Sequence, residues 1–425
     1  MQQPTTGTDN RYAIFIIGAL FFIFGFITWL NGILIPFLKL ACQLKSDIEA
    51  FFVTSAFYMA YFFLAIPSSY ILKKTGFKNG MALGLFVMAI GSVIFIPAAN
   101  TRNFSFFLIG LFVQGAGLAL LQTASNPYIS ILGPINSAAK RISIMGICNK
   151  TAGILSPIIL GALVLKGATA TETKIREATD MVQKNIWLDE LASRVIAPYV
   201  VMTIVLALVA FLIVKSKLPE IREPEESDES ILAATKSSPL QFPHLVLGVL
   251  CIFLYVGAEV MAGDAIGTYG KALGMPLDET KFFTTFTLCA MLAGYIVGIF
   301  TIPKILSQQK ALTISAILGM IFTVCVFATS GYVAITFIAL LGLANALMWP
   351  SIFPLAIDGL GKFTKIGAAL LVMGIAGGAV LPLIYSSLKD KVHLTNQLSF
   401  LVCMLPCYLY ILYYSLSGYR AGKRN

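Results

Sequence analysis

The sequence predicts an all-α membrane protein with twelve transmembrane helices arranged as two pseudo-symmetric six-helix bundles. Three observations predict this class. Of the 425 residues, 58% are hydrophobic and only 12% are charged, whereas a soluble domain carries about 25% charged residues. Twelve segments are long and apolar enough to cross a bilayer as helices. The two halves of the chain also share small motifs at a constant offset.

This composition excludes several classes of protein. A chain so apolar cannot cover its own surface with polar groups in water, so it is neither an ordinary soluble enzyme nor a disordered protein. The net charge is +10, but the basic residues are scattered singly through short loops. Because they form no stripe or patch, no nucleic-acid partner is expected. Barrel strands would be about ten residues long with strict alternation, and these segments are longer and do not alternate.

The twelve predicted spans follow one another along the chain. They cover residues 12–38, 48–72, 81–99, 105–133, 142–166, 195–214, 244–270, 281–303, 311–331, 333–357, 366–388 and 398–418. The first apolar run is too long for the core of a signal peptide, and no small-residue cleavage site follows it. We therefore expect it to remain in the protein as a span.

Lys and Arg in the loops predict the orientation. With the N-terminus in the cytoplasm, the short inside segments hold thirteen of these residues and the short outside loops hold seven. Inside loops are enriched in Lys and Arg, and an even number of spans returns the chain to the same side. The sequence therefore predicts that both termini are cytoplasmic.

Two longer loops divide the chain. The first, residues 166–194, is expected to be an external loop with charges of both signs, and the second, residues 215–243, is an acidic, Pro-containing cytoplasmic linker. The predicted organisation is a cytoplasmic tail (1–11), an N-terminal six-helix bundle (12–214), the linker (215–243), a C-terminal six-helix bundle (244–418) and a second cytoplasmic tail (419–425).

The two predicted bundles echo each other in sequence. A Gly-Leu-Ala triplet occurs at 117–119 and again at 342–344, an offset of 225 residues. Gly153 and Gly378, each followed four residues later by proline, differ by the same offset. Weak internal symmetry of this kind is typical of transporters built from repeated units around a central site.

Motifs for other chemistry are missing. The chain has no GxxxxGK[ST] loop for ATP and no HExxH zinc motif. Its two histidines, His244 and His393, lie at span ends, and its seven cysteines fall mostly within spans as small core residues. No polar catalytic cluster can be assembled, so we expect neither an enzyme, nor a cofactor, nor a bound metal.

Three charged residues lie inside predicted spans and not at their ends: Lys150 in span 142–166, and Glu259 and Asp264 in span 244–270. Such groups are costly in a bilayer unless they are paired or hydrated, and therefore indicate function. A regular helix would point Glu259 and Asp264 about 140° apart. Stretch 257–267 is interrupted by glycines, however, and broken helices commonly hold transporter sites. The alternatives are a structural ion pair between Glu259 and Lys150 and a place for Asp264 at the extracellular mouth.

Uncharged polar and aromatic residues complete the candidate site. Amides both donate and accept hydrogen bonds, and together with aromatic faces they suit a neutral polyhydroxylated ligand such as a sugar. The candidate substrate-binding residues are Trp29, Asn31, Gln122, Asn149, Asn345 and Trp349. The alternative for any one of these amides is hydrogen bonding between helices.

Several strings resemble the fucose–galactose–glucose:cation symporter family of the major facilitator superfamily. They are GFITWLNGILIP (25–36), KKTGFKNG (73–80), LQTASNPY (121–128), YVGAEV (255–260), NALMWPSIFPLAI (345–357) and AGGAVLPLI (376–384). The resemblance extends over most of the chain and implies the major facilitator fold. It also implies sugar contacts at Asn31, Gln122 and Asn149.

Departures from the family pattern concern the carboxylates. The proton-coupled fucose branch has an Asp where this chain has Gly32, and a Glu where it has Gln122. Gln122 resembles the glucose/galactose branch instead, although Gly32 is unusual there too. Lys150, next to the family's Asn at 149, is unexpected.

The sequence therefore predicts a cation-coupled hexose transporter of the bacterial inner membrane that works by alternating access as a monomer. We expect Glu259 to bind the transported Na⁺ or H⁺. In a rival reading, Lys150 acts as a fixed cation in an uncoupled facilitator. A membrane enzyme or sensor is the third reading.

Overall fold

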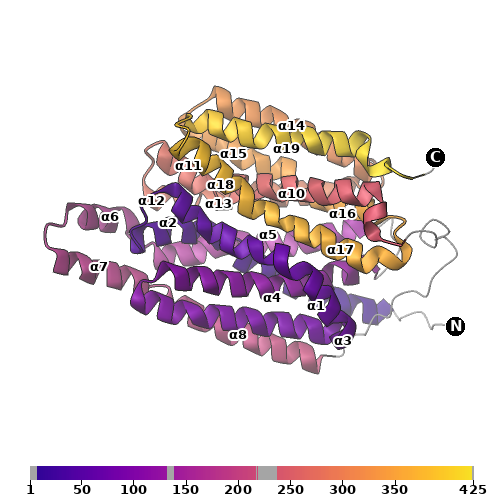
Figure 1. Cartoon of the computed structure of the whole chain (residues 1–425), viewed down its shortest axis with the longest axis horizontal. Helices are drawn as coiled ribbons and strands as arrows, with labels where there is room; N and C mark the ends of the chain where they lie inside the picture. The colour runs from indigo at the N-terminus through magenta and orange to yellow at the C-terminus, as the bar shows by residue number, and fades with distance from the viewer. Residues whose placement is uncertain (1–6, 132–137, 217, 219–236, 424–425) are drawn as a thin grey trace.

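The computed structural model describes residues 7–131, 138–216, 218 and 237–423, and these residues are almost entirely helical. Figure 1 shows the helices lying roughly side by side along the long axis of the molecule. The start of α1 (Gly7–Thr28) and the end of α19 (Asn396–Leu416) lie at one end of the bundle, which we call the terminal end. The short helices α6 (Ala168–Glu177) and α7 (Met181–Ser193) lie at the other, which we call the α6 end.

The helices of the two halves fall in the predicted order. The first half continues with α2 (Asn31–Ala41), α3 (Asp47–Thr101), α4 (Phe104–Ile131), α5 (Ala138–Val164) and α8 (Ile196–Lys215). The second half contains α10 (Pro243–Gly263), α11 (Ile266–Ala272), α12 (Leu277–Thr280), α13 (Phe283–Thr301), α14 (Gln308–Ala328), α15 (Gly331–Asn345), α16 (Met348–Ile357), α17 (Thr364–Met373) and α18 (Gly377–Asp390).

Helix α3 is two spans joined by a sharp reversal. Its 55 residues include Gly76, whose φ of 75° and ψ of 173° are not helical. Phe57 and Gly91 would lie about 51 Å apart on a straight helix, yet both contact the same part of α4, around Gly115. The described residues hold 11 helices long and apolar enough to cross a membrane. Because α3 crosses twice, the predicted number of twelve spans is confirmed.

Four of the spans are broken near their middle. The first changes direction at Trp29 and Leu30, between α1 and α2, and the seventh at Asp264 and Ala265, between α10 and α11. Further breaks separate α15 from α16 and, through a short 3-10 turn, α17 from α18. The sequence predicts only the break after α10, where glycines interrupt the apolar run. Unwound backbone at this depth is tolerated where protein covers it or where it lines a cavity.

The contacts of two equivalent glycines show the pseudo-symmetry. A Cβ on Gly153 of α5 would meet Trp29 of its own half and Leu288 on α13 of the other half. A Cβ on Gly378 of α18 would meet Val260 of its own half and Tyr58 on α3 of the other half. Each glycine lets three helices approach closely. The same packing thus occurs twice, with the two halves exchanged.

The outer surface and the longer loops complete the fold. Large apolar side chains such as Ile204, Phe211 and Phe300 are exposed, as expected for a surface that faces lipid. The expected external loop 166–194 contains the two short helices α6 and α7, which the sequence analysis does not predict. The linker 215–243 lies mostly outside the described residues, and α1 already begins at Gly7, within the predicted tail.

Candidate functional site

A cavity of about 100 Å³ lies at the interface between the two halves. Its walls come from α1, α3, α4 and α5 of the first half and from α10, α13 and α16 of the second. The lining residues are Phe21, Phe24, Thr28, Trp29, Tyr58, Tyr61, Gln122, Asn126, Ile142, Gly146, Asn149, Lys150, Tyr255, Val256, Glu259, Tyr295, Trp349 and Ile375. A site shared between two halves can change its access when the halves move against each other.

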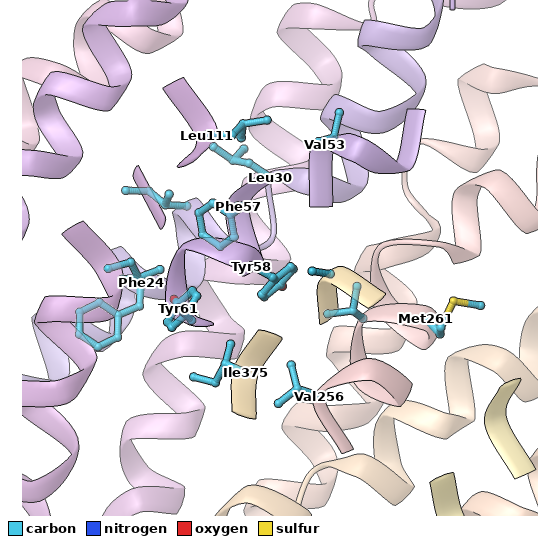
Figure 2. Packing of buried hydrophobic residues seen from close by; sticks show 14 of the residues in the cluster. Phe24, Leu30, Val53, Phe57, Tyr58, Tyr61, Leu111, Val256, Met261 and Ile375 are labelled. Carbon is cyan, nitrogen blue, oxygen red and sulfur yellow. The ribbon is translucent and has the colours of Figure 1, made fainter. Parts of the chain in front are cut away.

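Aromatic rings form much of this wall. Figure 2 shows Tyr58 and Tyr61, on α3, facing Val256 and Ile375 of the other half. The two tyrosine rings are stacked, with centroids 6.3 Å apart. Trp349 is stacked on Phe353, with centroids 5.6 Å apart. These rings present flat apolar faces beside polar groups, as ligand sites commonly do.

The predicted amides are held in place by neighbouring aromatic residues. The Trp29 indole N–H donates to Oδ1 of Asn149 over 3.3 Å, and the Asn149 amide donates to the backbone carbonyl of Phe21 over 3.4 Å. Nε2 of Gln122 donates to the Tyr61 hydroxyl over 3.1 Å. Each amide keeps further hydrogen-bonding capacity for a ligand.

Two of the predicted charges form an ion pair across the interface. Nζ of Lys150, on α5, lies 2.9 Å from Oε1 of Glu259, on α10, and both side chains are largely buried. The same ammonium lies 4.2 Å from the centroid of the Trp29 ring, a distance at which a cation is attracted to the ring face. The pair is neutral as a whole, so the cavity wall carries no net charge from these two residues.

Two predicted residues, Asn345 and Asn31, do not line the cavity. Asn345 is fully buried, and its Oδ1 accepts a hydrogen bond of 2.9 Å from the Tyr408 hydroxyl. The expected sugar contact is therefore, in this structure, a hydrogen bond between helices. Asn31 is 1% exposed, in the first turn of α2.

Asp264 lies outside the cavity and away from solvent. It follows the last residue of α10, and its exposed fraction is 0%. The alternative of a place at the extracellular mouth stays a prediction, and in this structure the side chain is buried. Glu259 lines the cavity and Asp264 does not, in line with the angle of about 140° that a regular helix sets between the two positions.

Comparison with known proteins identifies the family. The sequence model described as "Major Facilitator Superfamily" matches residues 17–384. The chain belongs to the major facilitator superfamily. A glucose/galactose transporter of Brucella abortus (strain 2308) is 33% identical over 420 residues, which make up 98% of this chain and 96% of that protein. An L-fucose-proton symporter of Escherichia coli (strain K12) is 29% identical, over 90% of this chain and 89% of that protein.

A solved structure agrees with the family assignment. A crystal structure of the Escherichia coli fucose:proton symporter matches with a TM-score of 0.76 and 26% identity, and the match covers 96% of this chain and 98% of that one. These findings confirm the predicted resemblance and the predicted fold class. This major facilitator protein is a multi-pass membrane transporter and not an enzyme.

The sequence analysis of this transporter missed the tyrosines of the cavity. Tyr58, Tyr61, Tyr255 and Tyr295 all line it. The only signal in the sequence is a hydroxyl-bearing ring in the middle of an apolar span, and buried tyrosines elsewhere, such as Tyr199, show the same pattern. Which of them face the cavity depends on how the helices pack.

Proposed function

We propose that this transporter moves a hexose, either a glucose- or galactose-like sugar or fucose, across the membrane by alternating access. The observation that carries the proposal is the cavity between the halves, where aromatic faces, two oriented amides and a neutral ion pair come together. Sugar rings carry hydroxyls that both donate and accept, and apolar C–H faces that pack on aromatic rings. The names of the relatives from Brucella abortus and Escherichia coli support a sugar.

The size of the cavity supports a closed state. Sites for small molecules usually enclose about 300–1,000 Å³, whereas this one holds about 100 Å³. Several contacts join the two halves at the α6 end: Lys271 pairs with Glu172, Lys389 pairs with Asp47, and the Thr169 backbone N–H donates to Asp278 over 3.1 Å. We propose that the halves rock apart to admit the sugar.

Transport is proposed to be coupled to a cation, Na⁺ or H⁺, through the buried charges Glu259, Asp264 and Lys150. One observation favours a second candidate, an uncoupled sugar facilitator. Because Lys150 already pairs with Glu259 at 2.9 Å, it can serve as a fixed cation in place of a transported one. In that case Lys150→Ala leaves Glu259 without its counter-charge and makes transport depend on an added cation.

Uptake of labelled glucose, galactose and fucose into proteoliposomes tests these proposals. An inward gradient of Na⁺ alone, of H⁺ alone, or of neither is imposed. Accumulation above the outside concentration with one gradient supports coupling to that ion, whereas equilibration that no gradient improves supports the facilitator. No flux of any of the three sugars would refute hexose transport.

Variants of the amides test the binding site. We expect Gln122→Ala and Asn149→Ala to raise the KM for sugar about three- to tenfold, the effect of losing one hydrogen bond. Gln114→Ala is the matched control, because Gln114 lies on the same helix α4, bonds to Ser92 over 2.8 Å and does not line the cavity. An equal effect of all three substitutions would contradict the proposed site.

We further propose that the protein is a monomer of the bacterial inner membrane with both termini in the cytoplasm. The excess of Lys and Arg in the predicted inside segments supports this orientation. In that case the α6 end faces the outside. The contacts between the two halves at this end then close the external side of the cavity.

A further inference from the structure

The break between α10 and α11 places a buried carboxylate against the start of α2. The exposed fraction of Asp264 is 0%, and neither of its side-chain oxygens accepts a hydrogen bond of normal geometry, although the backbone N–H of Gly32 faces it. A buried carboxylate that a single backbone N–H faces, without a hydrogen bond of normal geometry, is costly. A ligand bound by the carboxylate oxygens of Asp264 would remove this cost.

A second oxygen, that of the Thr284 hydroxyl, lies close to Gly32 as well. The Thr284 hydroxyl, on α13, donates its proton to the backbone carbonyl of Gly263 over 2.8 Å, so only its lone pairs can face elsewhere. A Cβ placed on Gly32 would lie 2.5 Å from this hydroxyl oxygen and 3.5 Å from Oδ1 of Asp264. The absence of a side chain at Gly32 therefore lets two oxygens that can only accept approach the same stretch of backbone. Two facing acceptors need a cation or a proton between them.

Asn31, of the other half, is a further buried amide without a partner. It precedes Gly32, is 1% exposed, and neither its Oδ1 nor its Nδ2 has a hydrogen bond of normal geometry. The Tyr58 hydroxyl neighbours both the Asn31 amide and the Asp264 carboxylate. Tyr58 also lines the cavity. Its side chain therefore lies between the cavity and the surroundings of Asp264.

The charges indicate a cation of single charge. Glu259 and Lys150 neutralise each other at 2.9 Å. They are also the two charged groups that act on Asp264, so the three together leave one negative charge without compensation. Carboxylate, amide and hydroxyl oxygens are hard ligands, which favour hard cations.

We propose that Asp264, Asn31 and Thr284 bind Na⁺ beside the backbone of Gly32. The site deepens the proposed function, on which it rests, by naming the co-transported ion and where it binds. Asn31 and Gly32 belong to the first half, and Asp264 and Thr284 to the second. Na⁺ therefore joins the halves and favours the state in which the α6 end is closed.

Binding of radioactive Na⁺ to the purified transporter in nanodiscs, without sugar, tests the site. We expect saturable binding by the parent, weakened at least about tenfold in Asp264→Asn, which removes a buried charge. Thr284→Val removes an oxygen, and Gly32→Ala presses a methyl group against that oxygen; each should weaken binding about three- to tenfold. Two matched controls should bind like the parent. They are Asp189→Asn, a carboxylate with 61% of its side chain exposed, and Gly18→Ala, where a Cβ meets nothing closer than 3.5 Å.

The results separate this site from the proposed function. Na⁺ binding that is absent in the parent, or equal in the parent and Asp264→Asn, overturns the site even if sugar is transported. Uptake driven by H⁺ alone, without Na⁺ binding, overturns it too. Na⁺ binding that depends on Asp264, together with no flux of any sugar, keeps the site and refutes hexose transport. Monodisperse elution of each variant shows that a loss of binding is not a loss of the fold.

Discussion

Lys150 and Glu259 show how one buried pair can serve both stability and mechanism. Their head groups are 2.9 Å apart, and their side chains are 7% and 12% exposed. Taking such charges out of water is costly, and the attraction between them offsets that cost only while both are present. The Trp29 ring adds a second attraction for the ammonium. The contribution of either side chain to stability therefore depends on the presence of the other.

A double-mutant cycle tests this unit. Lys150→Met and Glu259→Gln each leave one buried charge unpaired, which typically costs about 3–5 kcal/mol. The double variant leaves no charge, so we expect its melting temperature to lie above those of both single variants. Thermal unfolding in detergent, followed by loss of the monodisperse peak, measures all four proteins. Effects that simply add would show that the two side chains do not interact.

Gly32 stands where the fucose branch has a carboxylate, and a different carboxylate lies nearby. The resemblance places an Asp at this position in the fucose branch, and here the space holds the Thr284 hydroxyl and borders the Asp264 carboxylate. A carboxylate from α10 thus stands close to where the family places one on the first span. The sequence shows the loss at Gly32 plainly, but it does not show the neighbouring Asp264, because the break that brings the two together is a feature of the fold.

At the scale of elements, a group of ion pairs holds the α6 end closed. Asp47, at the start of α3, pairs with Lys39 of its own half and with Lys389 of the other half. Glu172 on α6 pairs with Lys271 on α11. Each pair is partly exposed and therefore weak by itself. Together they set the balance between closed and open states, which differ by only a few kcal/mol in a working transporter.

Removing the charge at Asp47 should shift that balance. In Asp47→Asn, Lys389 loses its partner in the other half, and we expect a larger population with the α6 end open. Spin labels at Lys174 on α6 and Ala272 at the end of α11, in a background without native cysteines, report the distance across this end by electron paramagnetic resonance.

Asp189→Asn provides the matched control for the ion pairs that hold the α6 end closed. Asp189 lies at the same end and pairs with Arg102 over 2.6 Å, but both residues belong to the first half. Its loss should leave the distance distribution unchanged. A distance distribution in Asp47→Asn identical to that of the parent would show that these ion pairs do not keep the α6 end closed.

At the scale of the whole molecule, hydrophobic length made the fold predictable. Each span is long enough to cross a bilayer, and its backbone must be hydrogen-bonded internally, so helices are the only solution for these segments. Hydrophobic length does not predict α6 and α7, because these short helices carry many charges, Glu172 and Asp189 among them. Such short helices depend on contacts that composition does not show.

The site was harder to predict than the fold. Lys150 and Glu259 stood out because charges are rare at membrane depth, and the structure joins them. Asn345 and Gln122 looked alike in the sequence, yet one bonds to Tyr408 in the packed interior and the other faces the cavity. Which face of a helix meets the cavity depends on crossing angles and on breaks such as the one between α1 and α2.

The repeated glycine contacts give a last prediction for the molecule as a whole. A Cβ on Gly153 would lie 2.5 Å from the Trp29 ring and 3.0 Å from Leu288, and one on Gly378 would lie 2.9 Å from Val260 and 3.0 Å from Tyr58. Either Gly→Ala change wedges the two halves apart, at a cost of about 1–3 kcal/mol. Because the contacts are equivalent, we expect both variants to slow sugar exchange in proteoliposomes about tenfold. Gly18→Ala, with ordinary contacts, is the control. Slowing by one glycine alone would contradict an equal role of the two halves in transport.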